Sequence, residues 1–149
     1  MVRKVMNNLQ EAMNVQLANW AVLYVKLHHK HWYVKGPHFP TLHAKFEELY
    51  DLAAEKWDEL AERILTIEGK PASTMKEYLE LATIKEADKG GAESDILAGA
   101  IEDLKALVSG LEDTAMLATE VGDDATADLF IGQIGELQKQ VWLLSATLA

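Results

Sequence analysis

Residues 69–91 read GKPASTMKEYLELATIKEADKGG, and this segment separates two pairs of long helical patterns. Gly69 and Pro71 end the pattern before it, residues 75–81 predict one short helix, and the Lys-Gly-Gly at 89–91 predicts a loop. The links inside the two pairs are much shorter, so each pair is expected to form an antiparallel hairpin. A plain up-down bundle would not need so long a link, and we therefore expect a crossover connection between the hairpins.

On either side of this segment, apolar residues recur every three or four positions, which predicts four amphipathic helices. We expect them over residues 7–34, 41–68, 92–121 and from residue 124 onward, with Gly122 ending the third and Asp123 or Asp124 capping the fourth. The expected core positions are Leu17, Trp20, Tyr24, Leu27, His31, Val34, Phe46, Leu49, Ala53, Trp57, Leu60, Ile64, Ile96, Ala100, Leu104, Leu107, Leu111, Ala115, Ala118, Ala127, Phe130, Ile134, Leu137, Val141, Leu144 and Leu148. No strand-like alternation is present. The predicted fold class is all-α: one ferritin-like four-helix bundle domain over residues 1–149, with a short helix in the crossover between helices two and three.

Composition narrows the class of protein. The 149 residues suffice for one domain with a real core, and the absence of Cys excludes disulfides and thiolate metal sites. The N-terminus lacks the apolar stretch of a signal peptide, and the longest apolar run, residues 20–25, is too short to span a membrane. We therefore expect a soluble protein of the reducing cytoplasm.

The formal net charge of −10 argues against nucleic acid as a partner and favours cations. A nucleic-acid-binding protein usually carries a basic patch or tail, and the only candidate here is the pair Arg3 and Lys4.

All five histidines fall within residues 28–43, but no Glu-x-x-His motif occurs and no acidic residue follows Glu11 in the first helix. Metal-binding four-helix bundles often place that motif on two helices. A di-iron site in the middle of a single bundle is therefore not expected.

The second predicted helix carries a different candidate, in which His43, Glu47, Asp58 and Glu62 fall within an arc of about 100°. Glu47 and Asp58 lie roughly 16 Å apart along the axis, so one copy cannot bring these residues to one metal ion. If two copies cross antiparallel near residues 52 and 53, His43 faces Glu62 of the partner subunit, and Glu47 faces Asp58 of the partner subunit. His31 would complete a set of imidazoles and carboxylates that suits iron, manganese or zinc. The alternative is that His31 is a hydrogen-bonded core residue and the carboxylates form a solvated face.

Three segments carry a resemblance to a known family: HWYVKGPHFPTLHAKFEELYD at 31–51, WDELAERIL at 57–65 and GKPASTMKEYLE at 69–80. They resemble the Dps family of mini-ferritins, and the similarity continues to QVWLLSATL near the end of the chain. The resemblance implies a hollow dodecamer of tetrahedral symmetry with an Fe(II)-oxidising site, holding up to two irons, between twofold-related chains. It assigns metal binding to His31 and His43 with Asp58 and Glu62 of the partner subunit. Many members have Asp where this chain has Glu47, which puts the second metal position in doubt.

The resemblance also implies a ferroxidase that oxidises Fe(II) with hydrogen peroxide or oxygen and stores Fe(III) mineral, which limits oxidative damage. Trp32 and Trp57 flank the predicted ligands and are candidates for passing electrons or trapping radicals, although Trp57 also fits the core stripe. The candidates for mineral nucleation are Glu48, Asp51 and Glu55, and the alternative for them is a solvated face. The candidates for lining an iron entry pore are Asp123 and Asp128, and the alternative for them is helix capping. We expect His28 to support His31 and expect His29 and His38 to be solvated.

The expectation about DNA differs from the family pattern. DNA-binding members of the family use a mobile tail rich in Lys and Arg. Here the first helix is expected to begin within about six residues of Met1 and the last to reach Ala149, so DNA binding is not expected. Two alternatives remain: a DNA-compacting or structural shell protein without ferroxidase turnover, and a bundle that holds zinc.

Overall fold

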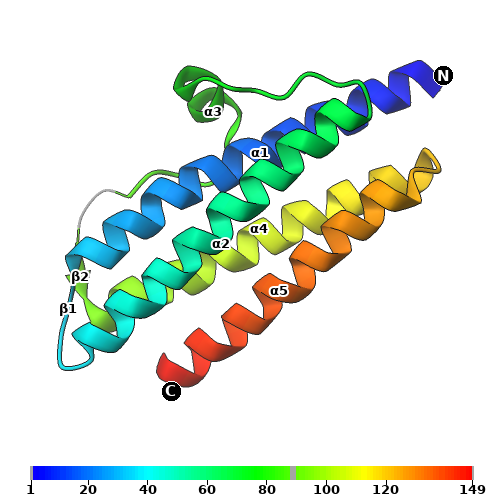
Figure 1. The fold of residues 1–149 in the computed structure, drawn as a ribbon. Helices are drawn as coiled ribbons and strands as arrows, with labels where there is room; N and C mark the ends of the chain where they lie inside the picture. The colour runs from blue at the N-terminus through cyan, green and yellow to red at the C-terminus, as the bar shows by residue number, and fades with distance from the viewer. Residues whose placement is uncertain (1, 88–89, 149) are drawn as a thin grey trace.

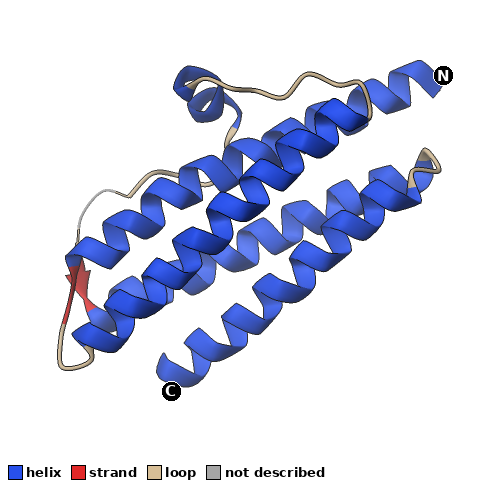
Figure 2. Cartoon of the chain, in the orientation of Figure 1, coloured by secondary structure: helices blue, strands red, loops and turns tan. Residues whose placement is uncertain are grey.

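The computed structural model describes residues 2–87 and 90–148, and over these residues the fold is the predicted all-α bundle (Figures 1 and 2). In chain order the elements are α1 (Val2–Tyr33), β1 (Val34–Lys35), α2 (Phe39–Thr66), α3 (Met75–Leu81), β2 (Gly91–Ala92), α4 (Glu93–Glu120) and α5 (Asp124–Leu148). The short helix α3 has the predicted bounds, whereas α1 and α2 begin before the expected residues 7 and 41. None of the helices in the described ranges is long and apolar enough to cross a membrane.

The predicted crossover is confirmed by the path of the chain. Helices α1 and α2 form one antiparallel hairpin, and α4 and α5 form the other (Figure 1). The segment after α2 packs α3 against α1 and then returns along the bundle to the end where α1 meets α2 (Figure 1). Because α4 starts at that end, α2 and α4 run in the same direction, which is the ferritin-like arrangement.

The structure adds one small strand pairing to the predicted all-α fold. β1 pairs with β2 in parallel, with Val34 opposite Gly91 and Lys35 opposite Ala92. This pairing joins the end of α1 to the chain that enters α4. A strand of two residues has no room for apolar alternation, so periodicity could not have predicted it.

The predicted core positions are buried with few exceptions. Tyr24, Trp57, Ile134 and Val141 are only partly buried at the edge of the core. Leu148 is wrong as a core residue, because its side chain is 43% exposed on the last turn of α5. Periodicity identifies the apolar face of a helix but not the point where neighbouring helices stop covering it.

Two asparagines of α1 hold the crossover segment in place. The Asn19 side chain is buried, and its Oδ1 accepts the backbone N–H groups of Thr83 at 2.8 Å and Ile84 at 3.0 Å. Asn14 accepts the N–H of Ala72 at 2.8 Å and donates to the carbonyl of Lys70 at 3.1 Å. These side chains satisfy backbone groups that no helix or sheet pairs, so the long link follows a defined path.

The helix ends confirm one expected cap and correct another. Gly122 has φ +79° after α4, and Asp123 caps α5 by accepting the N–H of Thr126 at 3.1 Å. After α2, however, the left-handed residue is Glu68, with φ +65°, and not Gly69. The N–H of Gly69 then bonds to the carbonyl of Ile64 at 2.8 Å, which completes the cap.

Candidate metal centre

His31 and His43 form a stacked pair where the end of α1 meets the start of α2. Their ring centroids lie 3.6 Å apart, with an interplanar angle of 14°. Nδ1 of His31 lies 2.6 Å from the backbone carbonyl oxygen of His43, and Nδ1 of His43 lies 2.8 Å from that of His31. Each imidazole is therefore oriented by the backbone of the other residue, across two helices.

These reciprocal bonds determine which ring nitrogen can bind a metal. A carbonyl oxygen only accepts, so each Nδ1 must donate its proton, and in the neutral imidazole the Nε2 lone pair is then free. Metal-binding histidines commonly use their second nitrogen in this way. The structure brings the two predicted histidines together, and each ring keeps Nε2 as its candidate metal-binding atom.

Glu47 lies one turn into α2 from His43, and its side chain is exposed. The Tyr50 hydroxyl donates to Oε1 of Glu47 at 3.4 Å, and the Tyr50 ring meets the His31 ring edge-on with centroids 5.3 Å apart. Desolvation and the negative charge of Glu47 raise the pKa of the Tyr50 hydroxyl above its ordinary value. Sequence analysis missed Tyr50, although its position three residues after Glu47 places it on the same helix face.

Asp58 and Glu62 lie on the later half of α2, away from the histidine pair. Both carboxylates are exposed in an open hollow that is also lined by Glu55, Glu59 and Arg63. Within residues 2–87 and 90–148, no three side chains of His, Cys, Asp or Glu lie close enough to hold one metal ion. The predicted ligands therefore form two separate groups in one chain, as their spacing along α2 requires.

The two tryptophans predicted beside the site differ in their surroundings. Trp32 is 65% exposed, and its ring centroid lies 5.4 Å from that of His28. Trp57 is partly buried against Tyr24 and Tyr78, at centroid distances of 5.9 and 5.6 Å, which supports a packing role. A catalytic role for either residue stays a prediction.

The other three histidines have partners of their own. His28 stacks on Tyr50, with centroids 3.6 Å apart, and its Nδ1 bonds to the carbonyl of Tyr24 at 2.9 Å. His38 is not merely solvated, because its backbone N–H donates to Glu93 and its Nδ1 lies 3.0 Å from Oε2 of that residue. His29 is also not fully solvated, since it is partly buried and its ring lies 4.7 Å from that of Tyr33.

Asp123 is engaged as a helix cap. Besides the N–H of Thr126, it accepts the Thr126 hydroxyl at 2.5 Å and Arg63 Nη2 at 3.2 Å. Burial opposes ionisation, but the bonds from Thr126 and Arg63 outweigh it, so the pKa of Asp123 lies below its ordinary value. Asp128 is exposed. A place for either residue at an iron entry pore stays a prediction.

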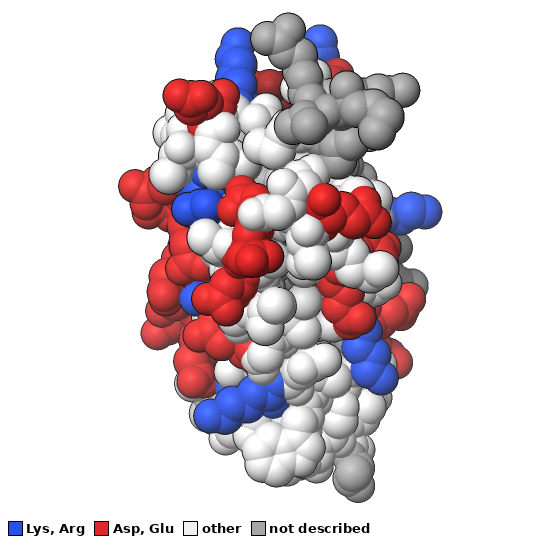
Figure 3. Space-filling view, turned by 90° about the vertical axis from the view of Figure 1, so that its right-hand side faces the viewer, with Lys and Arg blue, Asp and Glu red and all other residues white. Residues whose placement is uncertain are grey.

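Acidic side chains form extended areas on the side of the molecule drawn in Figure 3, with Lys and Arg scattered among them. Among the predicted nucleation residues, Glu48 pairs with Lys45 at 3.3 Å, Glu55 lies 3.6 Å from Lys56 Nζ, and Asp51 is exposed. The side chains of Arg3 and Lys4 lie outside the part of the structure that is described.

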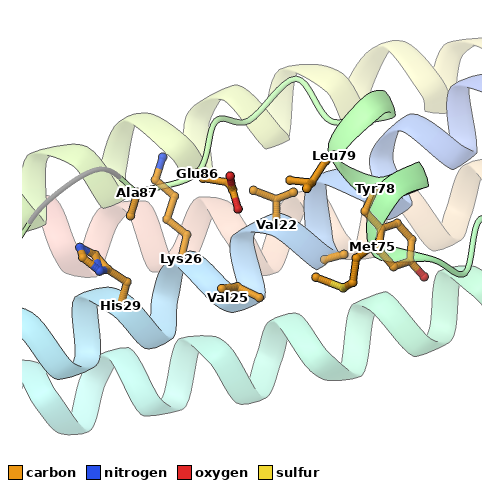
Figure 4. Close-up of a pocket in the computed structure, with 10 residues that line it drawn as sticks. Val22, Val25, Lys26, His29, Met75, Tyr78, Leu79, Glu86 and Ala87 are labelled. Atoms are coloured by element: carbon orange, nitrogen blue, oxygen red, sulfur yellow. The ribbon is translucent and has the colours of Figure 1, made fainter.

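A separate, mostly apolar pocket lies between α1 and α3. It is lined by Val22, Val25, Met75, Tyr78 and Leu79, with polar side chains including Lys26 towards one end (Figure 4). None of the predicted metal ligands lines it.

The helical bundle and the paired histidines define a ferritin-like protein, and comparison with known proteins agrees. The family model of the ferritin-like domain matches residues 10–149. The DNA protection during starvation protein 2 of Bacillus anthracis is 47% identical over 93% of this chain and 94% of its own length. This chain therefore belongs to the Dps family of ferritin-like proteins, as the sequence motifs predicted.

Solved structures of the family superpose closely. The crystal structure of a Dps protein from Bacillus brevis matches with a TM-score of 0.96 and 44% identity, over 98% of each chain. The Dps protein of Vibrio cholerae, described as a member of a broad superfamily of ferritin-like diiron-carboxylate proteins, matches with a TM-score of 0.93. It is 38% identical, over 98% of this chain and 92% of that one.

Proposed function

We propose that this chain is a cytoplasmic ferroxidase and iron-storage subunit whose iron-binding site is shared between two copies. The observation that carries the proposal is the His31–His43 pair, whose Nδ1 atoms bond to backbone carbonyls and leave both Nε2 atoms as candidate ligands, one turn of α2 before Glu47. Asp58 lies roughly 16 Å from Glu47 along the axis of α2, and Glu62 lies about one turn further on. A second copy crossing antiparallel would bring its own two carboxylates to this pair.

The chemistry of these ligands suits iron oxidation. Imidazole nitrogens and carboxylate oxygens bind Fe(II), and the carboxylates stabilise Fe(III) more because oxidation adds one positive charge. Two Fe(II) ions each lose one electron, and one hydrogen peroxide molecule accepts both. Its O–O bond breaks, and with two protons it yields two water molecules. Fe(III) then moves to acidic side chains on the inner wall of the shell, where mineral forms.

Assembly and physiological role follow from the same site. We propose a homododecamer, because a site shared across a twofold axis needs at least two copies and family membership favours the closed shell. The relative from Bacillus anthracis is named for DNA protection during starvation. Removal of Fe(II) and peroxide would protect DNA without contact, and the net charge of −10 favours this indirect route.

The test mixes the assembled protein with Fe(II) and hydrogen peroxide and follows ferric absorbance. His31→Gly combined with His43→Gly should slow oxidation by at least about tenfold, because it removes both nitrogen ligands. His38→Gln is the matched control, since His38 is exposed and pairs with Glu93 instead. A wild-type rate in the double variant, with an unchanged native mass, would refute the site.

A further inference from the structure

Glu47 has a longer side chain than the Asp that many family members have at this position, so its carboxylate needs to be positioned. A Glu carboxylate ends one carbon further from the backbone than an Asp carboxylate, and it has one more rotatable bond to fix when a metal binds. Glu47 is exposed, so burial does not restrict its rotamers. Ordering such a side chain costs conformational entropy, which lowers metal affinity unless a neighbour has already restricted it.

Tyr50 is placed to supply that restriction. Its hydroxyl donates to Oε1 of Glu47 at 3.4 Å, from a position three residues later on the same helix face. The same ring is perpendicular to the His31 ring, with centroids 5.3 Å apart and planes at 88°. One side chain of α2 therefore touches two predicted ligands, one on each helix of the hairpin.

The orientation of Tyr50 is itself held from α1. The His28 ring stacks on the Tyr50 ring at 3.6 Å with planes 16° apart, and Tyr24 meets it edge-on at 6.2 Å. His28 is oriented in turn by the bond from its Nδ1 to the Tyr24 carbonyl. Rotation of the phenol away from Glu47 would break the stacking contact, so the hydroxyl is held towards the carboxylate.

We propose that Tyr50 is a positioning residue of the shared iron site, which holds the Glu47 carboxylate through its hydroxyl and supports His31 with its ring. The inference rests on the proposed function, because it assigns Tyr50 a role only through those two ligands. It explains how a Glu at position 47 serves where many family members have Asp.

The test measures Zn²⁺ binding to the assembled protein by calorimetry, because Zn²⁺ takes the same nitrogen and oxygen ligands and has no redox chemistry. Tyr50→Phe removes only the hydroxyl, so the melting temperature should not change. We expect Zn²⁺ affinity to fall about three- to tenfold, the effect of one lost hydrogen bond. In a Glu47→Asp background the hydroxyl has no carboxylate within reach, and the same change should alter affinity less than about twofold.

Variants at His28 test the stacking contact. His28→Ala should weaken Zn²⁺ binding in the same direction as Tyr50→Phe, whereas His28→Phe retains a ring on Tyr50 and should bind like the wild type. Unchanged affinity in Tyr50→Phe, or an equal loss in both backgrounds at position 47, would overturn the positioning role alone. Unchanged Zn²⁺ binding in the His31→Gly, His43→Gly variant would overturn the site and the positioning role together.

Discussion

At the residue scale, the site depends on how two rings and two carbonyl groups are arranged. His31 and His43 were predicted as a pair from the resemblance to the family, whereas helix spacing alone indicated only that His31 would complete the set. The bond from each ring to the backbone carbonyl of the other histidine could not be predicted, because it depends on how the last turn of α1 meets the first turns of α2. Tyr50 was missed for a similar reason: its hydroxyl bond to Glu47 has no motif of its own.

Asp123 gives a prediction about pH. Its pKa is lower in the folded chain, so it contributes stability above the unfolded value of about 3.9, and that contribution is lost as the pH falls through the folded value. At pH 7, Asp123→Ala should lower stability by about 1–2 kcal/mol, because α5 loses its cap and Arg63 its partner. Below about pH 4 the difference from the wild type should shrink.

Melting temperatures at a fixed protein concentration, measured at pH 7 and at about pH 3.5, check this expectation. Asp124→Ala is the matched control, because Asp124 is the exposed neighbour in the first turn of α5. A deficit in Asp123→Ala that stays the same at both pH values would contradict the ionic origin of the effect.

At the element scale, helix periodicity predicted the bundle well and its connections only in part. The short helix α3 was predicted at residues 75–81, and in the structure the Thr74 hydroxyl caps it by accepting the N–H of Glu77 at 3.2 Å. The path of the rest of the crossover was not predicted, because it depends on hydrogen bonds from the polar side chains Asn14 and Asn19 of α1. A lone Asn on an apolar face gives no signal in the sequence of what it will bind.

Asn19 therefore carries a prediction about the crossover. Asn19→Ala removes the acceptor of the N–H groups of Thr83 and Ile84, and we expect a loss of about 2–3 kcal/mol in stability. Hydrogen exchange should accelerate at the amides of residues 83 and 84 before it changes in α4 or α5. Asn8→Ala is the control, since Asn8 is exposed on the same helix. Slow exchange at both amides in the Asn19 variant would show that another group holds the segment.

At the scale of the whole molecule, one chain keeps the predicted ligands in two separate groups and carries a large excess of negative charge. Both features support the proposed assembly around cations, because the predicted ligands lie in two groups on α2 and an acidic surface attracts cations. The apolar pocket between α1 and α3 shows that other surfaces also remain uncovered in the single chain (Figure 4). The quaternary arrangement could not be derived from periodicity, because the periodic positions describe only the core of one bundle.

The same charge leads to a prediction about DNA. In the proposed dodecamer, twelve chains of net charge −10 would carry about 120 negative charges, and phosphate repulsion should prevent binding at physiological salt. We expect the assembled protein to leave plasmid DNA unretarded in a gel at about 0.15 M salt. Lowering the pH towards the pI of about 4.9 removes most of the net repulsion, and retardation that appears only there would agree with the charge argument. Retardation of the plasmid at neutral pH and physiological salt would contradict the charge argument. The basic pair Arg3 and Lys4 would then be the candidate DNA contact, and replacement of both by Gln should abolish the retardation.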